Sequence, residues 1–276
     1  MSGFLSEMAT ASQARVRTAK ARISEAALLE RAGATQAPPP LRHAAQGFDL
    51  IAELKLRSPA AGALGALDSS VAGRVTAYAR AGAAAVSVLT EPSRFDGSLD
   101  HLTDAAQALA PLDVPAMRKD FLVDTYQVLE ARAAGAGGVL LILRMLSRDT
   151  LAALIECARK HGLFVLLEAF DADDVARMHE VIAADAGRST LLAGVNCRDL
   201  TSLQVFPARL LELAPLLPRG VPHVAESGVE SPADARRLAA AGYGLILVGS
   251  VLMRGADPGA LAQALLAAGR AARGGS

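Results

Sequence analysis

The sequence predicts an α/β fold in which eight strand–helix units close into a (β/α)8 barrel. Two observations lead to this prediction. After residue 47, short apolar segments recur at intervals of roughly 22–36 residues, and helix start and stop signals follow them. These segments lack polar alternation, so we expect them to be buried on both faces, as in a parallel sheet. A doubly wound open sheet is the alternative, but it would need fewer strands and usually a glycine-rich turn after the first one.

The eight predicted strands are residues 50–55, 84–89, 115–119, 138–143, 163–168, 191–196, 222–226 and 245–248. Two of the connecting helices have clear boundaries. Ser147 is a plausible N-cap with Gly162 as a stop, and Ser231, followed by Pro-Ala-Asp, begins a helix that ends at Gly242. The glycine-rich segment 135–138 precedes a strand, so it does not match a dinucleotide-binding turn.

Residues 4–31 are predicted to form one amphipathic helix, whose apolar stripe is interrupted by Ser12. A stiff proline-rich connector at 37–40 follows. We therefore expect a helical extension over residues 1–46, packed on a single catalytic barrel domain over residues 47–276. A partner-binding helix is the alternative role for the extension.

Composition narrows the class of protein. The chain has 28 basic and 28 acidic residues, which argues against a nucleic-acid partner. Its two cysteines, Cys157 and Cys197, cannot form a disulfide framework and suit a reducing compartment. We find no signal peptide, and the most apolar stretch, 137–143, is too short to cross a membrane. A cytoplasmic protein without a membrane partner is the expectation.

The first predicted strand places two opposite charges on one face. Glu53 and Lys55 lie two residues apart, so the pleat points both the same way. Ser58, before a proline, marks the start of a loop. A surface strand with one salt-bridged face is the alternative interpretation, but polar groups follow the later apolar strands too.

In a barrel of this kind, the chemistry lies where the strands end. Strand ends supply Lys119, Glu168, Asn196 and Glu226, with Arg198 just beyond. Like charges held close together and partly dry push pKa values apart, which provides general acids and bases near neutral pH. A salt-bridged rim is the alternative for this cluster.

The last two strands are followed by Ser227-Gly228 and by Gly249-Ser250. Glycine lets the backbone approach an anion closely, and the loops after strands seven and eight commonly hold phosphate in this fold. Residues 251–253 would form a short helix there. Alternatively, the glycines make turns and nothing more. The five histidines are scattered without metal-ligand spacing, and alternation points Cys197 away from the mouth, as a core thiol.

These motifs resemble the indole-3-glycerol phosphate synthase family. The likeness rests on IAELKLRSP, VSVLTEPSRFDGS, RKDFLVDTYQVLEARAAGA, LLEA, GVNCRDL, VAESGV and LVGSVLM, in that order from about residue 51 to 253. The family closes an indole ring on 1-(2-carboxyphenylamino)-1-deoxyribulose 5-phosphate, losing carbon dioxide and water. The resemblance implies a small-molecule sugar-phosphate substrate, no cofactor, no metal, and a monomer or weak homodimer in tryptophan biosynthesis.

The resemblance also implies roles for individual residues. Lys119 matches the general acid of ring closure, and Glu168 the acid/base of dehydration. Lys55 matches the lysine that meets the substrate carboxylate and acts as an acid in dehydration. The polar residues expected to position or polarise the substrate are Glu53, Asn196 and Glu226, with Ser58 and Arg198 as further contacts. The expected phosphate ligands are Ser227, Gly228, Gly249 and Ser250, and the expected ring pocket is formed by Phe95, Phe121 and Leu140.

Two other functions remain open from the sequence. A non-catalytic barrel could bind an anionic ligand, although such a relic is expected to lose some strand-end acids or amines. A phosphoribosylanthranilate isomerase would carry a cysteine base at the end of the first strand, where Glu53 and Lys55 stand. The sequence departs from the family pattern after Ser58-Pro59, where Ala-Ala-Gly follows and one loop hydroxyl is missing.

Overall fold

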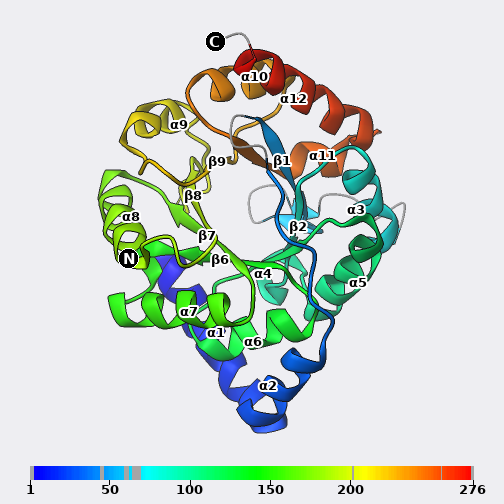
Figure 1. Cartoon of the computed structure of the whole chain (residues 1–276), viewed down its shortest axis with the longest axis vertical. Coiled ribbons are helices and arrows are strands. Elements are labelled where there is room, and N and C mark those ends of the chain that lie inside the picture. The colour runs from blue at the N-terminus through cyan, green and yellow to red at the C-terminus, as the bar shows by residue number, and fades with distance from the viewer. Residues whose placement is uncertain are drawn as a thin grey trace.

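A computed structural model describes residues 3–43, 47–58, 62–63, 70–200, 202–255 and 257–274. Within them, eight parallel strands close into a barrel in the order β1-β10-β9-β8-β7-β6-β5-β4 (Figure 1). Its strands are β1 Asp49–Leu54, β4 Ala85–Leu89, β5 Ala116–Lys119, β6 Gly138–Ile142, β7 Phe164–Ala169, β8 Leu191–Asn196, β9 His223–Glu226 and β10 Leu245–Val248. This closure confirms the predicted barrel and excludes the open sheet.

Each predicted strand is found within one residue of its expected bounds, because its apolar composition matches a position that is buried on both faces. Every residue of β1, β4, β6, β7, β8 and β10 is buried. A small antiparallel hairpin of β2 Arg57–Ser58 and β3 Gly62–Ala63 follows β1.

Helices surround the barrel on its outer side (Figure 1). They are α3 Val71–Arg80, α5 Leu99–Leu109, α6 Thr125–Ala133, α7 Arg148–Lys160, α8 Ala172–Asp185, α9 Ala208–Leu213, α10 Pro232–Ala240 and α12 Pro258–Arg273. Shorter segments are α4 Pro92–Phe95, α11 Ser250–Arg254, and the 3-10 turns η1 Ala110–Leu112, η2 Leu143–Met145 and η3 Ala214–Leu216. The helix α11 confirms the short helix expected after the last strand.

The predicted helix boundaries have the expected cap chemistry. The Ser147 hydroxyl accepts a hydrogen bond from the Thr150 amide and begins α7. Ser231 and Asp234 form a capping box at the start of α10. Gly162 and Gly242 follow α7 and α10 with left-handed φ angles of +72° and +103°.

The prediction of one helix over residues 4–31 is wrong, because two helices, α1 Gly3–Arg22 and α2 Glu25–Ala34, occupy this segment. Ser24 has extended backbone angles and caps α2 by accepting from the Ala27 amide. The Tyr126 hydroxyl lies 3.2 Å from the carbonyl oxygen of Ala19 and 2.9 Å from that of Ile23. The hydroxyl thereby satisfies the Ile23 carbonyl just beyond the end of α1, and it is a second donor to the Ala19 carbonyl, which also accepts from the Ile23 amide at 3.0 Å.

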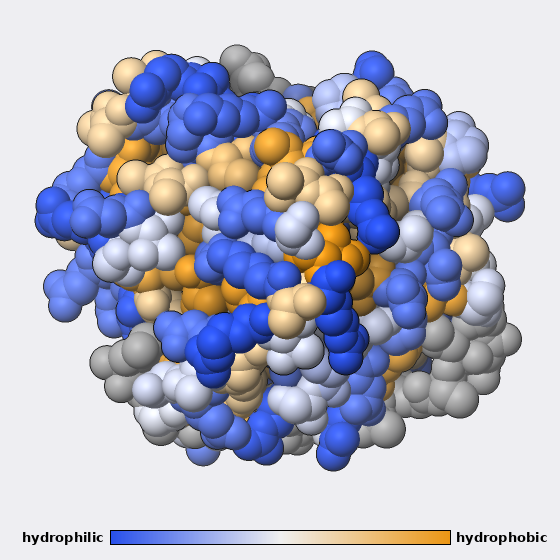
Figure 2. Space-filling model, turned by 90° about the horizontal axis from the view of Figure 1, so that it is seen from below, coloured by the Kyte–Doolittle hydropathy of each residue, from blue (hydrophilic) through white to orange (hydrophobic). Residues whose placement is uncertain are grey.

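The inner face of α1 joins the main core through Leu5 and Met8, while Val16 packs in a separate cluster with Leu28 of α2 and Tyr126 of α6. Seen from the end of the molecule where α2 lies, the surface is mostly hydrophilic, with hydrophobic residues showing between polar side chains (Figure 2). The domain boundary between residues 46 and 47 stays a prediction, since residue 46 lies outside the described residues.

Candidate active site

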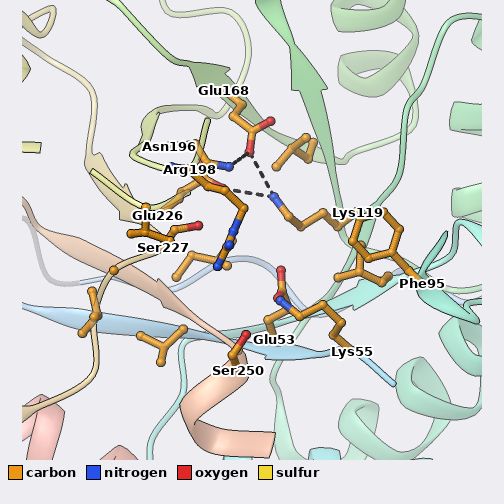
Figure 3. Close-up of a pocket in the computed structure, with 18 of the residues that line it drawn as sticks. Glu53, Lys55, Phe95, Lys119, Glu168, Asn196, Arg198, Glu226, Ser227 and Ser250 are labelled. Carbon is orange, nitrogen blue, oxygen red and sulfur yellow. Dashed lines mark hydrogen bonds and ion pairs between the residues drawn. The ribbon is translucent and has the colours of Figure 1, made fainter. Parts of the chain in front are cut away.

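The carboxyl ends of the barrel strands surround one cavity that brings most of the predicted site residues together. Its lining includes Glu53, Lys55, Phe95, Lys119, Phe121, Leu140, Glu168, Asn196, Arg198, Glu226, Ser227, Gly228, Gly249 and Ser250. Ser58 ends β2, but its side chain lies outside the described residues, as does Pro59 after it. The structure therefore places candidate groups from all eight barrel strands, or from the loops after them, around one space (Figure 3).

Lys119 lies at the centre of the charged cluster. Its Nζ atom is 3.1 Å from Glu168 Oε1 and 3.2 Å from Glu226 Oε2. Asn196 Nδ2 donates to the same Glu168 oxygen at 2.9 Å, so Glu168 is held from two sides (Figure 3). The lysine side chain is 16% exposed, whereas the two carboxylates are almost completely buried. These side chains are too deeply buried to form a solvated, salt-bridged rim, which was the alternative interpretation of the cluster.

The second ion pair of the cavity comes from the first strand. Lys55 Nζ lies 2.6 Å from Glu53 Oε1, and both side chains are largely buried. This geometry confirms that the two residues share one face, and it excludes a surface strand with an exposed salt-bridged face. Glu53 belongs to β1, while Lys55 follows directly after the strand ends.

The cluster shifts the pKa values of its members in different directions. Burial lowers the pKa of Lys119, but the negative charges of Glu168, Glu226 and Glu53 outweigh burial and raise it above its ordinary value. Burial raises the pKa of Glu226 to about 8, against the attraction of Lys119 and with help from Glu168. Near neutral pH the site therefore holds an ammonium group beside a carboxyl group that keeps its proton.

The Glu53 carboxyl behaves in the opposite way. Burial alone would raise its pKa, but the ammonium groups of Lys55 and Lys119 outweigh burial and lower it. Glu53 is therefore ionised where Glu226 is protonated, although both are buried carboxyl groups in the same cavity. Two carboxyl groups in opposite protonation states can serve as an acid and a base side by side.

The structure explains the glycines after β9 and β10 in different ways. Ser227 and Gly228 both have a left-handed φ of +68°. Gly249 has a φ of −126°, so its backbone conformation does not require glycine. A Cβ atom at Gly249 would instead overlap the Glu53 carboxylate. Turn formation alone therefore does not explain Gly249, which lets the backbone pass close to the charged cluster.

The opposite wall of the cavity is apolar and aromatic. Phe95 and Phe121 have ring centroids 6.3 Å apart and tilted planes, and Leu140 lies in the same lining. Behind them, Phe4 of α1 meets Phe121 edge to face at 5.9 Å. A flat aromatic ligand would fit against this wall while its charged groups face the lysines.

A charge network that reaches the lining at Asp120 was not predicted from the sequence. Arg15 of α1 lies 2.6 Å from Asp120 and 3.3 Å from Glu91, and Arg118 lies 3.2 Å from Asp120. Both carboxylates are nearly inaccessible to solvent. The strand end that carries Lys119 is thus fixed on both sides by paired charges. No local signal identifies the network, because Arg15 is far from β5 in sequence.

Other residues fulfil or extend the expectations. Cys197 is fully buried, which confirms the prediction of a core thiol, and burial raises its pKa to about 11. The lining also includes Arg254 and Glu230, which the strand ends did not indicate.

In the described part of the chain, no group of three or more His, Cys, Asp or Glu side chains could hold a metal ion. No described helix is long and apolar enough to cross a membrane.

The fold and the cavity together define a class of protein: a (β/α)8-barrel enzyme with an acid–base cluster at the carboxyl ends of its strands. Within that class, the chain belongs to the indole-3-glycerol phosphate synthase family, whose profile matches residues 5–265.

Named relatives agree over most of the chain. It is 45% identical over 224 residues to an indole-3-glycerol phosphate synthase of Kineococcus radiotolerans, covering 81% of this chain and 78% of the relative. It is 41% identical over 270 residues to indole-3-glycerol phosphate synthase 2 of Streptomyces coelicolor, covering 96% and 100%.

Solved structures with low sequence identity support the fold alone. The 3-hexulose-6-phosphate synthase of Salmonella typhimurium superposes with a TM-score of 0.62 at 16% identity, covering 82% of this chain and 100% of the other. The thiamine phosphate pyrophosphorylase of Pyrococcus furiosus gives a TM-score of 0.59 at 17% identity, covering 82% and 96%.

Proposed function

We propose that this chain is a carboxy-lyase of tryptophan biosynthesis that makes indole-3-glycerol phosphate from 1-(2-carboxyphenylamino)-1-deoxyribulose 5-phosphate. The reaction forms one carbon–carbon bond and releases one carbon dioxide and one water. The observation that carries the proposal is the Lys119 ammonium group held between two buried glutamates beside an aromatic wall, in a chain of this family.

Lys119 is the general acid of ring closure in this proposal. The ring carbon that bears the carboxylate attacks the ketose carbonyl, and Lys119 gives a proton to the oxygen as its negative charge develops. The raised pKa of Lys119 keeps it as an ammonium group before the substrate enters. Carbon dioxide then leaves with its bonding electrons passing to the ring, which restores aromaticity.

Dehydration needs an acid at the departing hydroxyl group and a base for the proton released as the indole forms. Glu168 supplies one of these functions, since Asn196 and Lys119 hold its Oε1 atom within 3.1 Å. Lys55 supplies the other function, with the ionised Glu53 beside it. Glu226 positions Lys119 and polarises the bound substrate.

The two ends of the substrate carry different charges. Lys55 faces the carboxylate, and the aromatic ring lies against Phe95, Phe121 and Leu140. The phosphate meets the backbone of the loops after β9 and β10. Its proposed ligands are Ser227, Gly228, Gly249 and Ser250, with Arg198 and Ser58 as further contacts.

The assembly and location are part of the proposal. We expect a cytoplasmic monomer or weak homodimer that binds neither nucleic acid nor membranes. The balance of 28 basic and 28 acidic residues supports the absence of a nucleic-acid partner. Light scattering coupled to size-exclusion chromatography would test it, and a tight larger oligomer would contradict it.

The decisive experiment is turnover of the carboxyphenylamino substrate, followed by indole fluorescence. The chain has no tryptophan, so the product signal rises over a low protein background. We expect turnover in the wild type and a fall of kcat by roughly 10²–10⁴-fold in Lys119→Ala. Lys160→Ala, an exposed lysine on the outer helix α7, is the matched control and should keep normal turnover.

A wild type that shows no product at high enzyme concentration, with its fold intact by circular dichroism, would refute the proposed function. Near-normal turnover in Lys119→Ala would refute the role of this lysine and leave the reaction in place. Glu168→Gln should accumulate the ring-closed intermediate, so its absorption spectrum tests the dehydration step separately.

A further inference from the structure

The charged side chains around the cavity differ in whether they already have a partner. Lys55 pairs with Glu53, and Lys119 pairs with Glu168 and Glu226. Arg254 lines the same cavity and is exposed, and its side chain forms no hydrogen bond or ion pair with the described residues. Because no protein acceptor holds the exposed guanidinium group, its five N–H donors are available to a ligand at the mouth of the cavity.

The position of Arg254 relates it to the phosphate end of the cavity. Helix α11 begins at Ser250 and ends at Arg254. The Met253 amide donates to the Gly249 carbonyl at 2.9 Å, which forms the first hydrogen bond of the helix. Residues four apart lie on one face of a helix, and side chains lean toward its N-terminus. Arg254 therefore shares a face with Ser250, one turn further along the helix, and both line the cavity.

Charge accounting supports a binding role. The cavity lining carries five acids, Glu53, Asp120, Glu168, Glu226 and Glu230, and four cations, Lys55, Lys119, Arg198 and Arg254. A ligand that bears both a carboxylate and a phosphate is strongly anionic. Lys119 and Lys55 are engaged by carboxylates, and Arg198 donates to the Leu203 carbonyl, so Arg254 adds positive charge beside Arg198 for the phosphate end of such a ligand.

We propose that Arg254 is a substrate-binding residue that contacts the phosphate group from the outer side of Ser250. This inference rests on the proposed function for the identity of the substrate, and its chemistry extends to any sugar or polyol phosphate monoester. The guanidinium group supplies charge-assisted hydrogen bonds to phosphate oxygens. Arg254 forms no hydrogen bond or ion pair with the acid–base cluster of Glu53, Lys55, Lys119, Glu168 and Glu226. We therefore expect it to affect binding of the ligand and to leave the chemical step unchanged.

The test compares Arg254→Ala, Arg254→Lys and a control, Arg219→Ala. Arg219 is exposed, unpaired among the described residues, and lies before β9, at the opposite end of the barrel strands. We expect Arg254→Ala to raise KM by about tenfold with kcat within about twofold of the wild type. Arg254→Lys should recover part of the loss, and Arg219→Ala should match the wild type.

A second readout does not require turnover. Calorimetric binding of glycerol 3-phosphate should weaken by a similar factor in Arg254→Ala and stay unchanged in Arg219→Ala. If the wild type binds this probe through Arg254 but makes no indole product, the inference stands and the proposed function fails. If the wild type turns over while Arg254→Ala keeps the KM and Kd of the control, the inference is overturned.

Measurements of stability distinguish a structural role of Arg254 from a role in ligand binding. Arginine in the last turn of α11 could interact with the helix end, so urea unfolding of each variant is measured alongside. Should Arg254→Ala unfold more easily, Arg254→Gln keeps the side-chain length and decides the matter. Weakened glycerol 3-phosphate binding in a stable Arg254→Gln supports the inference, and unchanged binding overturns it.

Discussion

Replacement of Ser12 by alanine tests how α1 supports the cavity. The Ser12 hydroxyl is completely buried, donates to the Phe121 carbonyl at 2.5 Å, and accepts from Gln127 Nε2 at 2.8 Å. Phe121 lines the cavity, and its amide is held by the Asp120 carboxylate at 2.8 Å. The serine thus joins α1 to the backbone of a residue in the aromatic wall.

The size of the effect follows from the two groups left without partners. In Ser12→Ala, the Phe121 carbonyl and the Gln127 amide both lose a partner in a region without solvent access. Each unsatisfied group costs about 1–3 kcal/mol, while alanine returns roughly 0.5 kcal/mol of helix propensity. We therefore expect the free energy of unfolding to fall by about 1.5–5.5 kcal/mol.

Equilibrium urea unfolding followed by circular dichroism measures this loss. Thr10→Ala is the matched control, because Thr10 is an exposed hydroxyl of the same helix that donates to the Ser6 carbonyl at 2.9 Å. It should change the free energy of unfolding by less than about 0.5 kcal/mol. A Ser12→Ala variant as stable as Thr10→Ala would refute the reasoning that the buried pair of hydrogen bonds anchors α1.

Three further changes have expected outcomes. Gly249→Ala should lower kcat by at least about tenfold without unfolding the chain, because the new Cβ would displace the Glu53 carboxylate, and normal turnover would contradict this. The pKa of Glu226, raised to about 8 mainly by burial, means that its protonation stabilises the fold below pH 4.5 and that this contribution is lost as pH rises through 8. The stability of Glu226→Gln should therefore fall less than that of the wild type between pH 6 and 9 in urea titrations, and parallel curves would argue against the shift. Arg15→Ala should lower the free energy of unfolding by about 1–3 kcal/mol and also reduce kcat, since Asp120 follows Lys119; unchanged values in both measurements would count against the network.

Much of the barrel could be predicted because its signals are local. Each strand is a short apolar run that is readily recognised in the sequence. Caps such as Ser147 and Ser231 mark helix starts because they bond to an amide three residues further on. The site was predictable for a related reason. Parallel strands bring their carboxyl ends to one face, so polar residues at those ends meet whatever the details of packing.

The N-terminal segment shows where local signals fail. The Ser24 cap that begins α2 is local, but the Tyr126 hydroxyl that binds carbonyls at the end of α1 lies about a hundred residues later in the chain. Ser12 weakened the apolar stripe in the sequence, yet it is among the most deeply buried residues of α1 because Phe121 and Gln127 satisfy it. A polar residue on an apolar face is a defect or an anchor depending on a partner that the sequence pattern does not reveal.

The protonation states of the buried acids likewise depend on partners that the sequence pattern does not reveal. One cavity therefore contains an ionised Glu53 and a protonated Glu226. Glu53 and Glu226 are both strand-end glutamates that are almost fully buried, and the sequence does not distinguish them. Glu53 has Lys55 at 2.6 Å for itself, whereas Glu226 shares Lys119 at 3.2 Å with Glu168. One lysine between two buried carboxylates cannot fully compensate both, so the proton stays on Glu226. Adding a substrate carboxylate beside Lys55 would weaken its hold on Glu53 and raise the pKa of that acid in turn. The acid and base roles of this cluster therefore depend on the shared Lys119, and its substitution should change the titration of both Glu226 and Glu53.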